Sequence, residues 1–333
     1  MYTRSTLFRL TLSLVFLALI LFSAPEAKAD SPALPATAKE TSLTTPTSRV
    51  VRPADTGAAL VNPGMGWTMM YYSNILTNYG SKLDPSDTLE DFPGLSVIYL
   101  RLPWAFLEPE EGHYDWSLLD TPAQRWGDHG KQIALRISCC ESWMRYATPQ
   151  WVEQAGAKGY NFESGKEKAD GPYWEPDYND PIFLSKLEAF LKALAARYDG
   201  NPAVAFVDVG SYGVWGEGHT WASTHRPYDD ATRQRHLDLY AQHFKKTLLS
   251  MNDDFVGPEI KDPNHPLAAH ARSLGMTLRD DSICVQPAPN SWFHAGLAQA
   301  FWPQVPVILE HEHYGSSKKT GAWGDGSLLA KAV

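Results

Sequence analysis

The stretch VAFVDVGSYGVWGEGH, residues 204–219, decides between two folds in which helices cover a parallel sheet. An apolar strand ends at Asp208 and continues into a glycine-rich turn. The first strand–helix connection of the chain has no G-x-G-x-x-G turn. In this later glycine run, Glu217 places a negative charge where a phosphate needs backbone amides. The stretch therefore disfavours a doubly wound dinucleotide-binding sheet and favours a (β/α) barrel.

Short apolar runs alternate with longer helical stretches along the rest of the chain, which is typical of a parallel sheet. The clearest helix is Pro181–Tyr198, preceded by Asp180 as a candidate N-cap. A second helix is predicted from the apolar spacing of Leu237, Tyr240, Phe244 and Leu248. The predicted strands are Gly64–Tyr72, Ser96–Trp104, Gln132–Cys140, Val204–Gly210, Thr247–Asn252, Met276–Cys284 and Val305–His311.

Nearly every predicted strand ends in polar or aromatic side chains, and in a TIM barrel that rim carries the active site. These side chains are Arg101, Trp104, Arg136, Asp208, Glu217, Asp280, Asp281, Glu310 and Glu312. The predicted fold is therefore an α/β protein with a TIM (β/α)8-type barrel. After the seventh strand only residues 314–333 remain, which is no complete strand–helix unit, so we expect a barrel truncated before its eighth strand.

The N-terminus has the pattern of a secretory signal peptide. Arg4 and Arg9 precede an apolar run from Leu10 to Phe22, and Ala27-Lys28-Ala29 is a cleavage signal. The apolar run is shorter than the roughly 20 residues of a spanning helix, so no membrane anchor is expected after cleavage. We predict a signal peptide over 1–29, a flexible Ser/Thr/Pro-rich leader over 30–49, and a C-terminally incomplete (β/α) barrel over 50–333. The protein would then be secreted or periplasmic.

Composition narrows the classes of partner. With 44% hydrophobic residues the chain can bury a large core, and its net charge of −9 gives no basic footprint for nucleic acid or an anionic membrane. Because the chain is acidic, neutral or cationic ligands suit it better than anionic ones. Cys139, Cys140 and Cys284 are too few for a disulfide scaffold; they are either packed thiols, or Cys284 is joined to one of the adjacent pair.

The segment RLPWAFLEPEEGHYDWSLLD, residues 101–120, carries a more specific pattern. It resembles the second-strand segment of clan A glycoside hydrolases, particularly the bacterial β-galactosidase-like members with a W-x-x-x-E-P-x-x-G-x-Y-D-W run. The likeness extends to NPGMGW at 62–67, GKQIALRIS at 130–138, YGVWGEGH at 212–219 and PVILEHE at 306–312. The resemblance implies a (β/α)8 barrel with Glu217 as acid/base and Glu310 as nucleophile. Gly216 departs from the family, which usually has Asn before its acid/base Glu.

The same two residues suit the chemistry of acetal hydrolysis. A retaining glycosidase needs one carboxylic acid with a raised pKa and one ionised carboxylate across the anomeric carbon. We expect the Trp- and Gly-rich turn to raise the pKa of Glu217, and Arg101 and Arg136 to keep Glu310 ionised. Glu312 is the alternative nucleophile, because residues two apart on a strand face the same way.

Further residues near the strand ends are candidates for binding sugar, because flat aromatic rings pack on the C–H faces of sugars and polar groups bind hydroxyls. Asp281 could accept a sugar hydroxyl or pair with Arg279, and Glu108 is expected to be structural. His311, Glu312, His313 and His219 do not have convincing metal spacing, so no metal or cofactor is expected. The predicted substrate-binding residues are Arg101, Trp104, Arg136, Tyr212, Trp215, His219, Asp281 and Glu312.

These observations predict a secreted glycoside hydrolase that is retaining and cleaves a neutral β-linked glycan or oligosaccharide with two Glu residues. The alternative is a barrel that binds carbohydrate without cleaving it, with Glu217 and Glu310 as hydrogen-bond acceptors.

Overall fold

The computed structural model describes residues 65–70, 94–163, 171–257, 262–283 and 294–311, together with the single residues 52, 54, 57 and 321. The chain divides into two compact units, Met1–Asp55 and Thr56–Val333. All helices and strands of the described residues belong to the second unit. The predicted signal peptide and leader lie outside the described residues and stay predictions.

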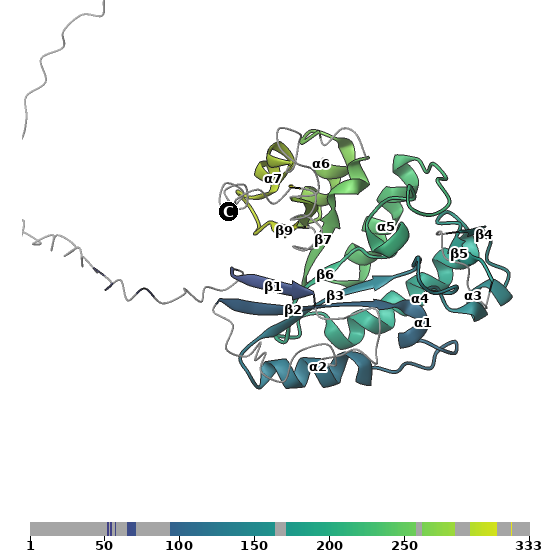
Figure 1. Ribbon diagram of the computed structural model, residues 1–333, viewed down its shortest axis with the longest axis horizontal. Helices are drawn as coiled ribbons and strands as arrows, with labels where there is room; N and C mark the ends of the chain where they lie inside the picture. The colour runs from purple at the N-terminus through teal and green to yellow at the C-terminus, as the bar shows by residue number, and fades with distance from the viewer. Residues whose placement is uncertain are drawn as a thin grey trace, which may run out of the picture. The chain divides into compact units, whose positions relative to one another are not determined.

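The second unit is built on a curled parallel sheet with the strand order β1-β2-β3-β6-β7-β8-β9 (Figure 1). Within the described residues, β1 and β9 are its two outer strands. All seven predicted strands are present, which confirms the barrel-type α/β fold. Their bounds are β1 Trp67–Met70, β2 Leu95–Pro103, β3 Gln132–Ser138, β6 Val204–Asp208, β7 Leu248–Asn252, β8 Thr277–Ile283 and β9 Ile308–His311.

Helices lie between the strands, and the described ranges also contain two 3₁₀ turns. The α-helices are α1 Trp104–Leu107, α2 Ser117–Gly127, α3 Gln150–Gln154, α4 Pro181–Tyr198, α5 Asp230–His243, α6 Pro266–Ser273 and α7 Ala295–Phe301; the 3₁₀ turns are η3 Val214–Gly216 and η4 Asp253–Val256. Helix α4 has the predicted bounds, because the Asp180 side chain accepts the backbone N–H groups of Ile182 and Phe183, each at 2.9 Å. None of the helices in the described ranges is long and apolar enough to cross a membrane.

The second predicted helix ends earlier than its apolar spacing indicated. Helix α5 stops at His243, and Leu248 begins β7. The Asp199 carboxylate accepts the backbone N–H groups of Lys245, Lys246 and Thr247, which takes them out of a helical ladder. The prediction that Phe244 and Leu248 continue the helix is therefore wrong.

The two faces of the sheet have different contents. Outward-facing residues such as Leu100, Leu135 and Val207 pack in the large core beneath the helices. At one end of the sheet, Val97, Tyr99, Ala134 and Phe206 form a separate small cluster on the opposite face. Following the period of two along β2 and β3 from that cluster leads to Arg101 and Arg136, so the inner face changes from apolar to charged toward the carboxyl ends of the strands.

A hairpin outside the main sheet was not predicted. Strands β4 (Gly159–Phe162) and β5 (Tyr173–Pro176) pair antiparallel. A Cβ on Gly159 would lie 2.2 Å from the Trp174 indole, so glycine is needed for this close packing. The hairpin precedes α4 and covers one side of the sheet's carboxyl end (Figure 1).

Candidate active site

A buried polar network forms the floor of the site, from strands far apart in the sequence. Asp208, at the end of β6, accepts hydrogen bonds from the hydroxyls of Tyr99 on β2 and Ser250 on β7. Its Oδ2 also lies 2.9 Å from Nε of Arg279 on β8. Burial raises the pKa of Asp208, against the opposing charges of Arg279 and Arg136.

Glu217 follows a turn whose backbone approaches β6 closely. Gly216 has a φ of +71°, and a Cβ there would lie 2.7 Å from the carbonyl oxygen of Gly210. Only glycine fits this conformation and this contact, which explains why Gly216 stands where the resemblance expects Asn. Trp215 beside it has a φ of 60°, an uncommon conformation for a bulky residue that is often found at functional sites.

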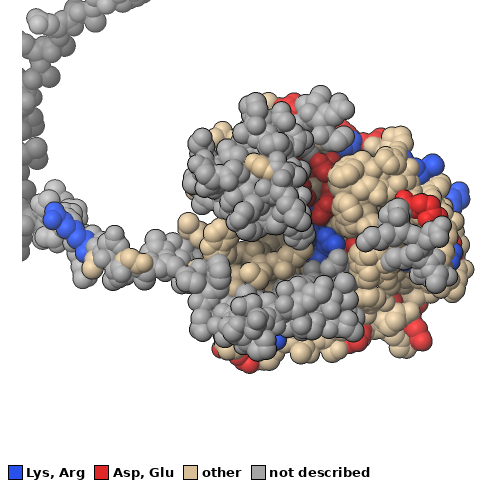
Figure 2. Space-filling view, viewed as in Figure 1, with Lys and Arg blue, Asp and Glu red and all other residues tan. Residues whose placement is uncertain are grey.

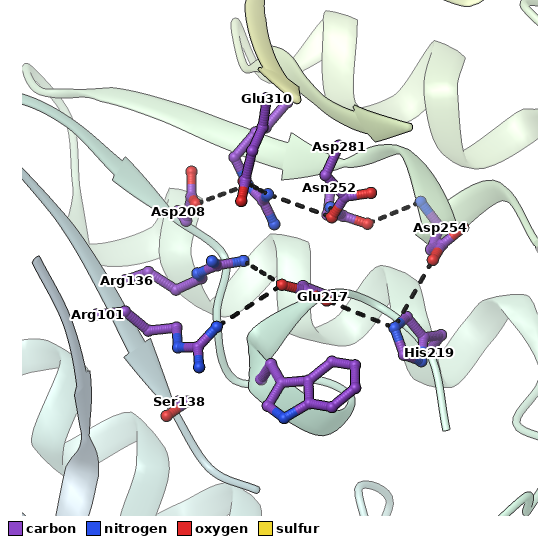
Figure 3. Close-up of polar contacts among 12 residues, drawn as sticks. Arg101, Arg136, Ser138, Asp208, Glu217, His219, Asn252, Asp254, Asp281 and Glu310 are labelled. Carbon is purple, nitrogen blue, oxygen red and sulfur yellow. Dashed lines mark hydrogen bonds and ion pairs between the residues drawn. The ribbon is translucent and has the colours of Figure 1, made fainter. Parts of the chain in front are cut away.

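Three donors surround the Glu217 carboxylate (Figure 3). Its Oε1 lies 3.1 Å from Nη1 of Arg136 on β3 and 3.8 Å from Nη1 of Arg101 on β2. Its Oε2 lies 3.6 Å from Nε2 of His219, whose Nε2 is in turn 3.9 Å from Oδ2 of Asp254. The Glu217 side chain is 16% exposed, so a ligand can still reach it.

The electrostatic environment of Glu217 differs from the expected one. Burial alone would raise its pKa, but the hydrogen bond with His219 and the charges of Arg136, Arg279 and Arg101 outweigh burial and lower the pKa to about 2. The prediction that the turn raises the pKa of Glu217 is therefore wrong, because two arginines from neighbouring strands point at its carboxylate.

Glu310 lies on β9 and is held by a different arginine. Nη1 of Arg279 donates to Glu310 Oε2 and lies 3.2 Å from Asp281 Oδ2. Of the two alternatives for Asp281, the structure has the ion pair with Arg279. Arg101 and Arg136 contact Glu217, so the arginine in direct contact with Glu310 is Arg279 and not either of the two expected ones. The charge of Arg136 still acts on Glu310, as expected, but from a greater distance.

Glu141 was not predicted from the sequence. It follows β3, and its side chain is fully buried. Its carboxylate accepts hydrogen bonds from Ser138 Oγ at 2.6 Å and from Trp143 Nε1 at 2.8 Å. It also lies 3.4 Å from Nε of Arg101. Glu141 thereby positions the guanidinium that reaches Glu217. A loop glutamate without a motif could not be distinguished from a surface charge in the sequence.

Three predicted substrate-binding residues have little or no exposed surface in this structure, so sugar binding by them stays a prediction. Trp104 has no exposed surface and packs in the core, with its ring 5.2 Å from that of Phe190. Tyr212 is 4% exposed and lies in an aromatic cluster with Tyr178. The Arg136 side chain has no exposed surface and lies against Glu217. The rim was predicted from strand ends alone, which cannot tell an inward side chain from an outward one.

The other predicted binding residues stand around Glu217. The Trp215 ring lies 5.8 Å from that of His219, and His219 stacks on Trp221 at 4.5 Å between ring centroids. Trp221 is 54% exposed. Figure 2 shows Lys or Arg and Asp or Glu side chains meeting in a hollow of this face. Sugar binding by Arg101, Trp215, His219 and Asp281 stays a prediction. Glu312 lies outside the described residues, so the choice between Glu310 and Glu312 stays open.

One group of described residues could bring three metal-ligand atoms together, namely Asp253, Asp280 and His294. Nδ1 of His294 lies 3.1 Å from Asp253 Oδ2 and 3.4 Å from Asp280 Oδ1. The two carboxylates outweigh the effect of burial and raise the pKa of His294 to about 9. A charged imidazole between two carboxylates forms a self-contained ion-pair cluster, and we interpret the group in that way. Cys139 and Cys140 are buried thiols, and Cys284 lies outside the described residues.

Comparison with known proteins supports the resemblance. The family model described as beta-galactosidase matches residues 93–248, a range that includes Glu217 and ends before Glu310. β-Galactosidase BbgII of Bifidobacterium bifidum is 29% identical over 115 residues, which cover 33% of this chain and 16% of that protein. The chain therefore spans about a sixth of the length of this curated relative. The predicted similarity to β-galactosidase-like clan A glycoside hydrolases is confirmed.

Solved structures that the chain resembles have low identity to it. A β-galactosidase from the psychrophilic Marinomonas ef1 has a TM-score of 0.38 and 14% identity, over 59% of this chain and 38% of that one. Endo-glycoceramidase II from Rhodococcus sp., as a lactosyl-enzyme intermediate, has a TM-score of 0.42 and 13% identity, over 76% and 74%. The catalytic domain of a Paenibacillus polymyxa β-amylase has a TM-score of 0.45 and 11% identity, over 72% and 83%.

Proposed function

Starting from the match of residues 93–248 to the β-galactosidase family, we propose that this chain is a glycoside hydrolase acting on neutral β-linked glycans, with β-galactosides as the first substrates to test. The observation that carries the proposal is the pair Glu217 and Glu310. Both lie at the carboxyl end of the parallel sheet, where (β/α) barrels build active sites, and both are partly exposed.

Two carboxylates on separate strand ends fit a retaining mechanism. Glu310 is proposed as the nucleophile, because Arg279 donates to it from the neighbouring strand and supports a negative charge there. Glu217 occupies the position that the resemblance assigns to the acid/base. With a pKa of about 2 it is a carboxylate in the resting protein.

The same lowered pKa favours a second candidate function, a barrel that binds sugar without cleaving it. In that case Glu217 and Glu310 would accept hydrogen bonds from sugar hydroxyls. Isothermal calorimetry with galactosides, followed by analysis of the recovered sugar, separates the two candidates. Bound sugar recovered intact after long incubation would favour the binding protein.

Hydrolysis is tested with a panel of aryl β-glycosides. Glu310→Gly should abolish turnover, and azide should restore it by attacking from the vacated side to give the inverted glycosyl azide. Glu217→Ala should also reduce turnover, but azide should not give the inverted glycosyl azide with this variant. Glu110→Gln, at a side chain that is 81% exposed, is the matched control and should leave turnover unchanged. If Glu310→Gly cleaves the panel as well as the unchanged protein, the nucleophile assignment is wrong.

We also propose export, on the basis of the signal-like segment at residues 1–29. Expression with the full N-terminus, followed by N-terminal sequencing of the exported protein, is expected to give Asp30 as the first residue. Retention of the full-length protein inside the cell would contradict this proposal.

A further inference from the structure

Trp221 has an exposed aromatic ring close to Glu217. The residue is 54% exposed, and its ring stacks on that of His219 with 4.5 Å between the centroids and 20° between the planes. Nε2 of His219 lies 3.6 Å from Oε2 of Glu217, so His219 contacts both residues. Because His219 covers one face of the indole, the exposed surface of Trp221 belongs to its other face and its edges.

The loop that carries Trp221 is anchored by a buried carboxylate. Glu175, on strand β5 of the hairpin, has no exposed surface. Its carboxylate accepts hydrogen bonds from Ser223 Oγ at 2.8 Å, from the Thr224 hydroxyl, and from Tyr178 Oη at 3.0 Å. A buried carboxylate costs stability unless its oxygens are paired, and here two of the groups that pair with it follow Trp221 directly. The hairpin therefore holds the segment after Trp221.

Two further contacts fix the chain around Trp221. Ala222 packs against a small apolar cluster that includes Tyr173 of β5. On the other side of the ring, Thr220 Oγ1 donates to the Arg226 carbonyl at 2.7 Å. The position of the exposed ring is thus set before a ligand arrives, so a ligand that packs on it does not have to order the loop.

The surroundings of Glu217 are closed on one side and open on the other. Arg136, whose Nη1 lies 3.1 Å from Glu217 Oε1, has no exposed surface in its side chain, and that of Arg279 is 1% exposed. Figure 3 shows Arg136 on one side of the Glu217 carboxylate and His219 on the other. A ligand that reaches Glu217 therefore has its remaining length on the side of His219 and Trp221.

The exposed face of Trp221 suits a sugar ring. The acid/base of a glycosidase acts on the glycosidic oxygen, so side chains beyond that residue face the leaving group. Glu217 occupies the acid/base position, and Trp221 lies beyond it. A flat indole packs well on the C–H face of a pyranose, whereas a leaving group as small as methanol covers little of such a ring.

We propose that Trp221 is the platform for the leaving group in the reaction proposed above, on which this inference rests, and that this leaving group is itself a sugar ring. The substrates are then disaccharides or longer oligosaccharides, in preference to glycosides of small alcohols. Glu175 is a positioning residue, because it acts on the leaving group through the loop that carries Trp221.

The test compares two β-galactosides that both release an alcohol: lactose, whose leaving group is a glucose ring, and methyl β-galactoside. In Trp221→Ala we expect kcat/KM for lactose to fall about 10- to 100-fold, mainly through KM, because packing on the ring is lost in the ground state and the transition state alike. For methyl β-galactoside, kcat/KM should change less than about threefold. Trp302→Ala, at a residue that is 69% exposed at the end of α7, is the matched control and should change neither value.

Two more variants separate a platform from an indirect effect on Glu217. Trp221→Phe keeps a flat ring and should recover most of the lactose turnover. Glu175→Gln keeps the volume of the side chain but weakens its hold on the loop, so kcat/KM for lactose should fall while that for methyl β-galactoside is spared. If Trp221→Ala lowers kcat/KM equally for the two substrates, Trp221 acts through His219 on Glu217 and the proposal is overturned.

A binding measurement does not depend on turnover. Thiolactose carries sulfur in place of the glycosidic oxygen, and by calorimetry the unchanged protein should bind it more tightly than methyl β-thiogalactoside. Trp221→Ala should lose this preference. If no glycoside is cleaved but the preference depends on Trp221, the proposed function fails and the sugar platform is supported on its own. If lactose is cleaved and neither KM nor thiolactose binding depends on Trp221, this inference fails while the proposed function stands.

Discussion

Gly216 determines the conformation of the backbone that leads into Glu217. Gly216→Ala would combine a φ of +71° with a Cβ only 2.7 Å from a backbone oxygen of Gly210. The conformation costs about 1–2 kcal/mol, and the contact adds a further cost because backbone atoms must move. We expect the variant to lose about 2–4 kcal/mol of unfolding free energy, measured by urea denaturation, and to have lower turnover.

Gly112→Ala is the matched control for this variant. Gly112 has a φ of +76°, and a Cβ there would meet nothing within 4 Å. It should therefore lose only the cost of the backbone conformation, about 1–2 kcal/mol. Equal losses in the two variants would show that the approach of Gly216 to Gly210 is not a constraint.

The motif that carries the family resemblance is a packing motif. Trp104 Nε1 donates to Glu108 Oε2 at 2.7 Å, and the Gly112 N–H donates to Glu108 Oε1 at 2.8 Å. Tyr114 stacks on Trp116 with ring centroids 4.8 Å apart. The structural role predicted for Glu108 is confirmed. The same contacts explain why Trp104, at a strand end, is a core residue: its polar N–H has a buried partner in its own motif.

At the scale of elements, sequence patterns predicted the bounds of those helices and strands that are determined by residues within the element itself. Helix α4 could be predicted to the residue, since its N-cap and apolar face lie within the helix itself. The end of α5 could not, because Asp199 from another connection binds the backbone after it. The hairpin of β4 and β5 was missed for a similar reason: the strands are only four residues each and Gly159 packs against Trp174.

Helix α5 carries a buried histidine that makes stability depend on pH. His236 has no exposed surface; its Nε2 donates to the Tyr178 carbonyl at 3.0 Å, and its Nδ1 lies 2.8 Å from Ser211 Oγ. A carbonyl can only accept, so Nε2 carries the hydrogen and Nδ1 accepts from the hydroxyl. Burial lowers the pKa of His236 from 6.5 to about 4.

The folded protein therefore binds fewer protons at His236 than the unfolded chain does between pH 4 and 6.5. This contribution to stability is complete above pH 6.5 and is lost as the pH falls, by about 3 kcal/mol at pH 4. Urea denaturation of His236→Gln should show a loss relative to the unchanged protein that becomes smaller from pH 6.5 to 4. His113→Gln, at a side chain that is 78% exposed, is the control. A constant difference across this range would contradict the prediction.

At the scale of the whole molecule, the site is assembled by contacts between strands. The positions of Glu217 and Glu310 at the carboxyl end of the sheet could be predicted because each follows or ends a recognisable strand. Their arginine partners could not be assigned, since strand register decides that Arg101 and Arg136 meet Glu217 while Arg279 meets Glu310. The lowered pKa of Glu217 follows from that register and is not contained in any local segment.

The ion pairs of His294 with η4 and β8 also make the stability of the fold depend on pH. His294 precedes α7, and its ring lies between Asp253 on η4 and Asp280 on β8, which are 1% and 0% exposed. Burial alone would lower its pKa, but the two carboxylates raise the pKa from 6.5 to about 9. The folded protein therefore holds a proton there that the unfolded chain releases between pH 6.5 and 9. The stabilisation is complete below pH 6.5 and is lost as the pH rises through 9, by about 3 kcal/mol.

Replacing His294 should remove this dependence of stability on pH. Urea denaturation of His294→Gln at pH 6 is expected to give a loss of about 3 kcal/mol relative to the unchanged protein, because two buried carboxylates lose their counter-charge. At pH 9.5 the two proteins should differ much less, since the imidazole is then neutral in both the folded and the unfolded chain. His113→Gln again serves as the control, because an exposed imidazole titrates alike in both states. A loss of equal size at pH 6 and pH 9.5 would show that His294 acts through packing, and that its charge does not hold α7 against the sheet.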